Sequence, residues 1–262
     1  MLRALRTAAL GMSTQQAGVD NIANNLANVN TTGYKRSTIV FQDLLYQTVQ
    51  AAGQGEAGGG AQPASLQMGH GATAIATVRN FTQGSFSETG NSLDMAINGE
   101  GFLQVLRPDG SIAYTRDGSF TLSADGTVVT QTGLALDPDL SIPAETIEIH
   151  ISQDGVVSVR LQNEPETVEV GQIELARFSN PSGLNPLGGN LFEQTAASGE
   201  PSIGTAGQEG FGVIRQGFLE ASNVDVVKEM VDLIMAQRAY EINSKMVTTS
   251  EDMLQIANSL KR

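Results

Sequence analysis

The residue types that enzymes most often use for nucleophilic or metal chemistry are scarce in this sequence. Cysteine is absent, and His70 and His150 are the only histidines. A serine or threonine nucleophile needs a base positioned beside it, and neither histidine lies in a nucleophile-elbow or triad motif. Zinc thiolate sites and disulfides both require cysteine. The sequence therefore predicts no cofactor, no metal site and no nucleophilic catalytic residue.

Carboxylates are the remaining candidates for chemistry. Asp94 and Asp117 could in principle serve as the acid and the base of a polysaccharide hydrolase. In a chain with 28 Asp and Glu residues, however, such pairs arise easily by chance. Gly55–Gly60 lacks the lysine of a phosphate-binding loop, and Asn98–Phe102 lacks the third glycine of a dinucleotide fingerprint. We expect no enzymatic activity, and the alternative of a different class is a secreted β-domain polysaccharide hydrolase.

The charge of the chain narrows the classes of partner. The net charge at pH 7 is −13, whereas nucleic acids and anionic membranes require a concentrated basic surface. The locally basic segment is N-terminal and contains Arg3, Arg6, Lys35 and Arg36. Arg6 interrupts the apolar run from Leu2 to Met12, so we expect no cleaved signal peptide, and no apolar stretch is long enough to span a membrane. We expect no nucleic-acid partner and no membrane-embedded segment.

Apolar residues recur alternately three and four positions apart at both ends of the chain. The N-terminal stripe comprises Leu2, Leu5, Ala9, Met12, Gln16, Val19, Ala23 and Leu26. The C-terminal stripe comprises Met235, Ala239, Ile242, Met246, Thr249, Met253, Ile256 and Leu260. This spacing predicts heptad helices within residues 1–30 and 220–262. Ser222, followed three residues later by Asp225, resembles a helix start, so the second helix should run from about Val224 to about Ser259. We expect the helices to form a coiled-coil-like domain.

Each stripe is narrow for the length of helix that it must stabilise. The large apolar side chains of the N-terminal stripe contribute on the order of 8–15 kcal/mol when fully buried. Ordering about 28 backbone residues costs on the order of 30–60 kcal/mol before hydrogen bonds offset part of it. Ala9 and Ala23 also allow another backbone to approach closely. We expect the helices to gain order from neighbouring copies of the chain, and the alternative is a helical hairpin within one chain.

Asparagines are concentrated where the N-terminal helix is expected to end. The set comprises Asn24, Asn25, Asn28 and Asn30. Its members fall mainly off the apolar stripe, where they weaken helicity but can hydrogen-bond to backbone or to a neighbouring chain. Thr31, Thr32 and Gly33 then provide a helix stop signal.

Between the helices the pattern changes to one typical of β structure. Residues 31–78 are expected to be an extended or linker segment, since Ala51–Ala64 has no hydrophobic period. Residues 79–219 predict a β-rich domain, with Pro181–Phe192 as a surface loop. The pairs expected to form hairpin turns are Asp109-Gly110, Asp117-Gly118, Asp125-Gly126 and Asp154-Gly155. The expected fold class is α+β, with terminal helices around a mainly-β middle.

Several stretches along the chain resemble those of one family. They are ANNLANVNTTGYK at 23–35, FQDLLYQT at 41–48, INGEGFLQV at 97–105, YTRDGSFTL at 114–122 and QGFLEASNVDVVKEMVDLIMAQRAYEINSKMV at 216–247. Together they are similar to the bacterial flagellar axial proteins of the rod and hook, and most of all to subunits of the distal rod. A proximal rod or hook-type axial subunit is the alternative within the family.

This resemblance implies a structural subunit that polymerises into a rigid helical tube, the shaft that transmits motor torque across the periplasm to the hook. It also implies that the terminal helices form the coiled-coil-like inner domain of the tube, with residues 31–78 and the β-rich outer domain, residues 79–219, outside them. The implied partners are further copies of the chain, the neighbouring proximal rod and hook proteins, the P-ring and L-ring proteins, and the type III export gate. The implied location is the rod of the flagellar basal body, reached by export without cleavage of a signal. Phe41, Leu44 and Leu45 resemble the short hydrophobic pattern with which early export substrates dock at the gate.

The residues expected to contribute to assembly lie on the two terminal segments. They are Leu2, Leu5, Met12, Val19, Asn24, Asn25, Leu26, Asn28, Asn30, Met235, Ile242, Met246, Met253, Ile256 and Leu260.

Overall fold

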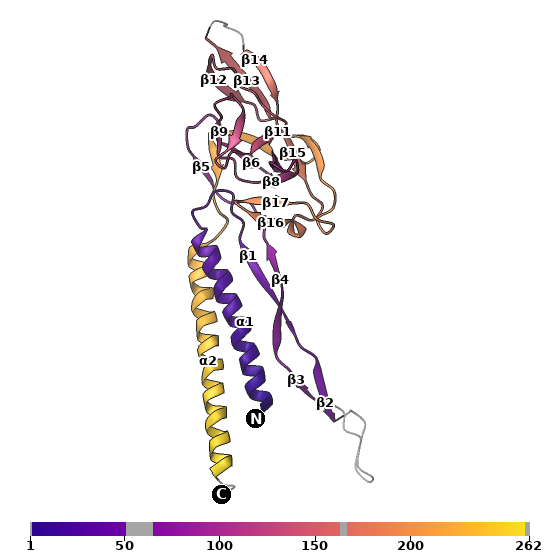
Figure 1. Cartoon of the computed structure of the whole chain (residues 1–262), viewed down its shortest axis with the longest axis vertical. Coiled ribbons are helices and arrows are strands. Elements are labelled where there is room, and N and C mark those ends of the chain that lie inside the picture. The colour runs from indigo at the N-terminus through magenta and orange to yellow at the C-terminus, as the bar shows by residue number, and fades with distance from the viewer. Residues whose placement is uncertain (1, 51–64, 163–166, 260–262) are drawn as a thin grey trace. The chain divides into compact units, whose positions relative to one another are not determined.

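A computed structural model describes residues 2–50, 65–162 and 167–259 (Figure 1). Leu260 and the Gly55–Gly60 stretch lie outside these ranges. The chain forms two compact units, one of residues 1–26, 37–78 and 225–262 and the other of residues 27–36 and 79–224. The prediction of an α+β fold with terminal helices and a mainly-β middle is confirmed.

The first unit contains two long helices, α1 (Leu2–Ala27) and α2 (Val226–Ser259), which lie side by side in Figure 1. They run antiparallel, because Asn25 of α1 contacts Glu229 near the start of α2, and Gly11 lies against Asn243 further along it. A Cβ atom at position 11 would come within 3.0 Å of the Asn243 amide nitrogen. Glycine therefore allows the two helices to approach closely at this point.

Local hydrogen bonds define the start of α2. The Asp225 carboxylate accepts hydrogen bonds from the backbone N–H groups of Val227 (2.9 Å) and Lys228 (3.2 Å), which makes Asp225 the N-cap. For this reason α2 begins at Val226, two residues later than expected. After α1, the chain turns at Gly33, whose φ of +67° favours glycine.

Four strands complete the first unit. They are β1 (Ser37–Asp43), β2 (Tyr46–Gln50), β3 (Leu66–Gly69) and β4 (Ala72–Arg79). β1 pairs with β4, and β2 pairs with β3 in an antiparallel ladder. In Figure 1 the two pairs follow one another as a long ribbon. Much of the described part of residues 31–78 is therefore paired β structure.

The described residues of the second unit form sixteen short strands in four sheets. Its largest sheet has the order β16-β17-β8-β7-β11-β10-β9, and β15 pairs with both β7 and β18. The strands of this sheet are β7 (Phe102–Leu106), β8 (Ile112–Thr115), β9 (Phe120–Leu122), β10 (Val128–Thr130), β11 (Ala135–Asp137), β15 (Glu174–Arg177), β16 (Asn185–Gly188), β17 (Leu191–Glu193) and β18 (Ser202–Thr205).

The remaining strands of this unit form smaller antiparallel sheets. They are β5 (Phe86–Glu88) with β20 (Phe218–Glu220), β6 (Met95–Asn98) with β19 (Val213–Gln216), and β12 (Thr146–Ile151), β13 (Val156–Leu161) and β14 (Thr167–Gln172). Consequently, strands from both ends of the unit's sequence pair with each other.

Two hydrophobic clusters form the core of the second unit. The larger contains residues such as Leu103, Val105 and Leu175, which are at most 1% exposed. The smaller is aromatic, and the ring of Phe102 makes edge contacts with Phe81 (5.4 Å) and Phe178 (5.8 Å). Successive residues of β7 point to opposite faces and both faces are buried, so Phe102 lies in the aromatic cluster and Leu103 in the larger one.

Three of the four Asp-Gly pairs form the predicted hairpin turns. Gly110, Gly126 and Gly155 have φ near +82° and connect paired strands. The prediction is wrong for Asp117-Gly118, because the strands on either side, β8 and β9, do not pair with each other. A Cβ at Gly118 would overlap the carbonyl oxygen of Met95, so this glycine permits a close backbone contact instead of a turn.

The stretch Pro181–Phe192 is more ordered than the predicted loop. It contains a short 3-10 helix, η1 (Pro181–Gly183), followed by the antiparallel pair of β16 and β17. Leu184 and Phe192 are buried, while Leu187 is 39% exposed. The glycines that interrupt the sequence lie at the hairpin connection, where Gly188 and Gly189 both have positive φ.

Candidate assembly interface

The face of α2 that packs inside the chain carries small and polar residues. Glu229, Ala236, Asn243 and Ser250 recur every seven residues, and Glu229, Ala236 and Ser250 are at most 9% exposed. Asn243 lies against Gly11 of α1. The sequence of α2 thus contains a second heptad stripe. The spacing of apolar residues does not reveal it, but the spacing of small and polar residues at the same period does.

The predicted apolar stripe of α2 is exposed in the chain. Its members Met235, Ile242, Met246, Met253 and Ile256 are between 48% and 66% exposed. The apolar side chains nearer the start of α2 are also exposed, and they include Val227 (72%), Met230 (51%), Val231 (51%) and Ile234 (54%). A helix with apolar residues on several sides is typical of one that is buried among several neighbours.

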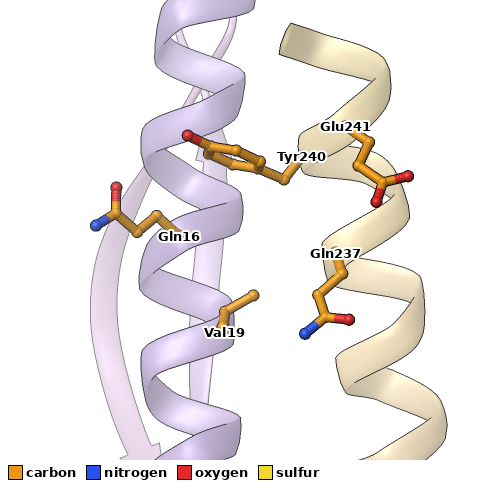
Figure 2. Close-up of a pocket in the computed structure, with 5 residues that line it drawn as sticks. All are labelled: Gln16, Val19, Gln237, Tyr240 and Glu241. Atoms are coloured by element: carbon orange, nitrogen blue, oxygen red, sulfur yellow. The ribbon is translucent and has the colours of Figure 1, made fainter.

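The corresponding side chains of α1 are partly covered. Leu5, Met12, Val19 and Leu26 are half-buried, and the side chain of Leu2 lies outside the described part. Val19 and Gln16 line a groove of about 350 Å³ together with three residues of α2, Gln237, Tyr240 and Glu241. Figure 2 shows the ring of Tyr240 reaching from α2 towards α1, while Glu241 points away from α1. The helix pair therefore leaves an open, partly apolar groove on its surface.

Asn25 is the central member of a buried polar cluster within the first unit. Its side chain is 0% exposed and donates to the Ser37 carbonyl oxygen (2.8 Å) and to the Glu229 carboxylate (3.1 Å). Its amide oxygen accepts from the backbone N–H of Ser37 (3.0 Å). Asn21 shares this role, because it bonds both the carbonyl oxygen and the hydroxyl of Ser37. The cluster joins α1, the start of β1 and the start of α2.

The other asparagines of the predicted set lie nearer the surface. Asn24 and Asn30 are exposed, and Asn28 is half-buried and accepts a hydrogen bond from the Thr31 hydroxyl (3.2 Å). The structure thus separates Asn25, which holds three segments of one chain together, from Asn24 and Asn30, which face outwards. No local pattern in the sequence indicates Ser37 or Glu229 as the partners of Asn25.

In the second unit, Lys35 belongs to a buried ionic cluster. Its ammonium donates to Glu220 Oε1 (2.5 Å) and to the Thr82 carbonyl oxygen (2.9 Å). Arg116 lies 3.4 Å from the other carboxylate oxygen of Glu220. Burial lowers the pKa of Lys35, although the negative charge of Glu220 opposes this shift, and burial likewise lowers the pKa of Arg116.

The turn before Lys35 fixes its position. The Gly33 N–H donates to the Glu220 carbonyl oxygen (2.8 Å), and Thr32 donates to the Asp117 carboxylate (3.0 Å). Arg79 stacks on the ring of Tyr34 at 5.7 Å. The Thr-Gly-Tyr-Lys turn is therefore built into the second unit by contacts on every side.

The predicted export-docking residues lie on and just after β1. Phe41 is 44% exposed and Leu45 is 88% exposed. Leu44 is half-buried, and its backbone N–H donates to the Gly71 carbonyl oxygen (2.8 Å). The structure thus presents two of the three apolar side chains on the surface of the first unit.

The carboxylates considered for catalysis hold loops in place. Asp94 accepts hydrogen bonds from the Thr89 hydroxyl (2.6 Å) and the Asn91 amide (3.0 Å). Asp117 accepts from the Ser119 hydroxyl (2.8 Å) in addition to Thr32. Across the described ranges, no three His, Asp or Glu side chains gather in a way that could hold a metal ion. Neither helix, over its described length, is apolar enough to cross a membrane.

Three parts of the chain match families of flagellar proteins. Residues 5–35 match the family described as flagella basal body rod protein. Residues 96–159 match the flagellar hook protein FlgE/F/G D1 domain, and residues 215–260 match the flagellar basal body rod FlgEFG protein C-terminal family. The matched regions include both helices and much of the β-rich part.

Curated relatives match over the full length. The chain is 51% identical to the flagellar basal-body rod protein FlgG of Borreliella burgdorferi over 264 residues, covering 100% of both chains. It is 38% identical to FlgG of Bacillus subtilis over 270 residues, again covering 100% of both. The flagellar basal-body rod protein FlgF of Caulobacter vibrioides is 36% identical over 251 residues, which cover 93% of each chain. Identity of this extent shows that the chain belongs to the FlgG family of flagellar basal-body rod proteins.

Proposed function

We propose that this chain is the structural subunit of the distal rod, and that its copies polymerise into a helical tube that transmits torque from the motor to the hook. Its terminal helices pack against those of neighbouring copies, and further contacts join it to proximal rod and hook proteins. The family to which the chain belongs supports an axial structural role. The proposal for self-assembly is carried by the exposed apolar stripe of α2.

The stripe has the properties of a surface that is buried on assembly. Met235 and Ile242 are more than 60% exposed, although methionine and isoleucine favour burial. Burying the remaining exposed area of each such side chain contributes about 1 kcal/mol. Summed along the helix, this free energy of burial is enough to favour association, although each single contact contributes little. The intramolecular face of α2 is already occupied by α1, so the stripe is left for other copies.

The segment 31–78 would add stiffness to the tube. Its described strands expose Val40, Tyr46, Val49, Leu66, Met68 and Ile75 to solvent. Two-stranded ribbons are marginal by themselves, which favours their packing against neighbouring subunits. We infer that this segment locks adjacent copies and that the β-rich unit faces the surrounding P-ring and L-ring proteins. Shortening the segment should make the rod bend more easily; unchanged bending stiffness would contradict this role.

The chain would reach the rod through the type III export apparatus without cleavage of a signal. Phe41 and Leu45 are exposed even in the folded chain, and in an unfolded chain they are fully available to the export gate. Phe41→Ala is expected to reduce secretion, with Val49→Ala as a matched exposed apolar control on the same ribbon. If the Phe41→Ala chain is secreted normally, only a packing role remains for this residue.

The test of self-assembly uses substitutions that keep helix propensity. Ile242→Gln and Met246→Gln together should leave far-UV circular dichroism and unfolding of the monomer nearly unchanged, because both side chains are already exposed. They should raise the concentration needed for polymerisation, as measured by sedimentation. Lys245→Gln, an exposed change on the same helix, is the control. Equal polymerisation of both variants would refute the proposed interface.

Amide hydrogen exchange gives an independent measurement. Residues of α2 should exchange faster in the monomer than in the polymer, since neighbouring copies cover the exposed faces only after assembly. Equal protection in both states would mean that the helices are stabilised entirely within one chain.

A position in the proximal rod or hook remains the alternative, which labelling of the assembled organelle decides. Measurable polysaccharide hydrolysis would favour the alternative of a different class.

A further inference from the structure

Arg215 differs from the other basic side chains of the second unit. Among the described Lys and Arg residues of this unit, Arg160 and Arg215 are exposed, while the others are half-buried or buried. The Arg160 guanidinium is already paired with the Glu148 carboxylate at 2.7 Å. No described carboxylate of the chain lies within ion-pair distance of Arg215. Arg215 is therefore an exposed cation whose partner is not among the described residues of its own chain.

Two aromatic rings hold the Arg215 side chain in place. Its guanidinium carbon lies 4.6 Å from the centre of the Phe218 ring and 5.3 Å from that of Phe86. Stacking on aromatic rings restricts the side chain and fixes the plane of the guanidinium. The N–H groups lie in that plane and remain free to donate to a ligand. The side chain is therefore ordered before any ligand arrives, which lowers the entropy cost of binding.

A groove of about 440 Å³ adjoins this side chain. It is lined by Arg215, Phe218, His150, Ser152 and Gln153, among others. His150 and Gln153 are exposed, so the groove offers further polar groups beside the guanidinium. Its wall is rigid, because the Gln216 amide donates to the Ile149 carbonyl oxygen (2.8 Å) and accepts from the Ile151 N–H (3.1 Å).

The chemistry of this site selects a carboxylate. A guanidinium with a fixed plane donates two parallel hydrogen bonds to a carboxylate, which is its best geometric match among side chains. The chain itself carries 28 Asp and Glu residues against 15 Lys and Arg residues. In a polymer, the carboxylates present at the highest local concentration are those of neighbouring copies. Exposed examples on the second unit are Glu145, Asp154, Glu169, Glu174 and Glu200.

We propose that Arg215, held by Phe86 and Phe218, binds a carboxylate on the β-rich unit of a second copy of this chain. This contact would set how the outer units of neighbouring subunits align, in addition to the packing of the helices. The inference rests on the proposed self-assembly and names a second, independent contact within it.

A zero-length crosslink tests the contact whichever acidic residue serves as the partner. Arg215→Lys places an amine at the site, and a carbodiimide joins an amine to a carboxylate that touches it. Chains purified from separate isotopically heavy and light cultures are mixed before polymerisation, and mass spectrometry identifies the linked peptides. Arg160→Lys is the matched control, because its expected link is to Glu148 of the same chain.

The expected product links position 215 of one chain to an Asp or Glu peptide of another, seen as a heavy–light pair. Arg215→Gln should also weaken polymerisation roughly tenfold, and Arg160→Gln should not. Absence of any interchain link at position 215, or a link only within one chain, overturns the proposal. Sedimentation of the unsubstituted and Arg160→Gln chains provides a separate readout, since it reports self-assembly whatever happens at Arg215.

Discussion

The buried cluster of Lys35, Arg116 and Glu220 makes a quantitative prediction about stability. It holds two cations and one carboxylate, and the side chains of Lys35 and Glu220 are both 0% exposed. Glu220→Gln leaves two buried cations without a counter-charge, which should cost about 3–5 kcal/mol of unfolding free energy. Lys35→Met instead leaves one cation facing one carboxylate. The two variants therefore differ in the net charge that remains buried.

Both acceptors of the Lys35 ammonium keep another hydrogen-bond donor when Lys35 is replaced. Thr82 O still accepts from the Asn223 amide (2.9 Å), and Glu220 Oε1 still accepts from the Gly84 N–H (2.9 Å). Burial also lowers the pKa of Lys35, which means that its surroundings disfavour the charged form despite Glu220. Lys35→Met should therefore cost only about 1–2 kcal/mol. The order of destabilisation is Glu220→Gln well above Lys35→Met.

Urea unfolding of the full chain, followed by far-UV circular dichroism, measures both values. Glu148→Gln removes the surface pair with Arg160 and should change the unfolding free energy by less than about 1 kcal/mol, which makes it the control. If Lys35→Met destabilises the chain as much as Glu220→Gln, the net buried charge does not determine the stability of this cluster. The same conclusion follows if Glu220→Gln behaves like the surface control.

Three further predictions concern the same two units. Burial lowers the pKa of Lys35 below its ordinary 10.5, so its contribution to stability is fully present above that value and is lost as the pH falls through the folded-state pKa. The unfolding free energy of the chain relative to Lys35→Met should thus rise as the pH approaches 10.5 from below. A difference that does not change with pH would contradict this. Asn25→Ala leaves the Ser37 N–H and the Glu229 carboxylate without their amide partner. It should lower the unfolding free energy by about 2–4 kcal/mol in urea titrations and weaken assembly, whereas Asn30→Ala, at an exposed position, should change little. Gly33→Ala places a Cβ on a residue with a φ of +67°, only 2.6 Å from the Asp117 backbone nitrogen. It should lower the melting temperature clearly more than Gly110→Ala, because Gly110 also has positive φ but open space around it. Equal shifts in melting temperature would refute the steric argument.

Local patterns in the sequence were sufficient for the elements of this fold. Heptad spacing predicted both helices, and the Asp-Gly pairs at 109–110, 125–126 and 154–155 marked real hairpins, because each depends on only a few neighbouring residues. Asp117-Gly118 shows where such reasoning fails. The same dipeptide there serves a close contact with Met95, and no local feature distinguishes the two uses.

The candidate interface was predicted only in part, again because the sequence pattern is local. The apolar stripe of α2 is visible from its period, but the period does not say whether the stripe packs within the chain or stays exposed. In the structure the stripe with Glu229, Ala236 and Ser250 takes the intramolecular place, since small residues let the helices approach and Glu229 has a partner in Asn25. That choice depends on the fit between two helices far apart in the sequence.

By itself, the sequence determined the helices, the turn-rich β region, the acidic charge and the family, all of which follow from composition, short-range periodicity and motifs. Only the tertiary structure decided which polar groups are buried together. Asn25 meets Glu229 across 204 positions, and Lys35 meets Glu220 across 185 positions. Such pairs are selected by the free-energy cost of leaving a buried polar group without a partner, and that cost exists only once folding has removed water from around it.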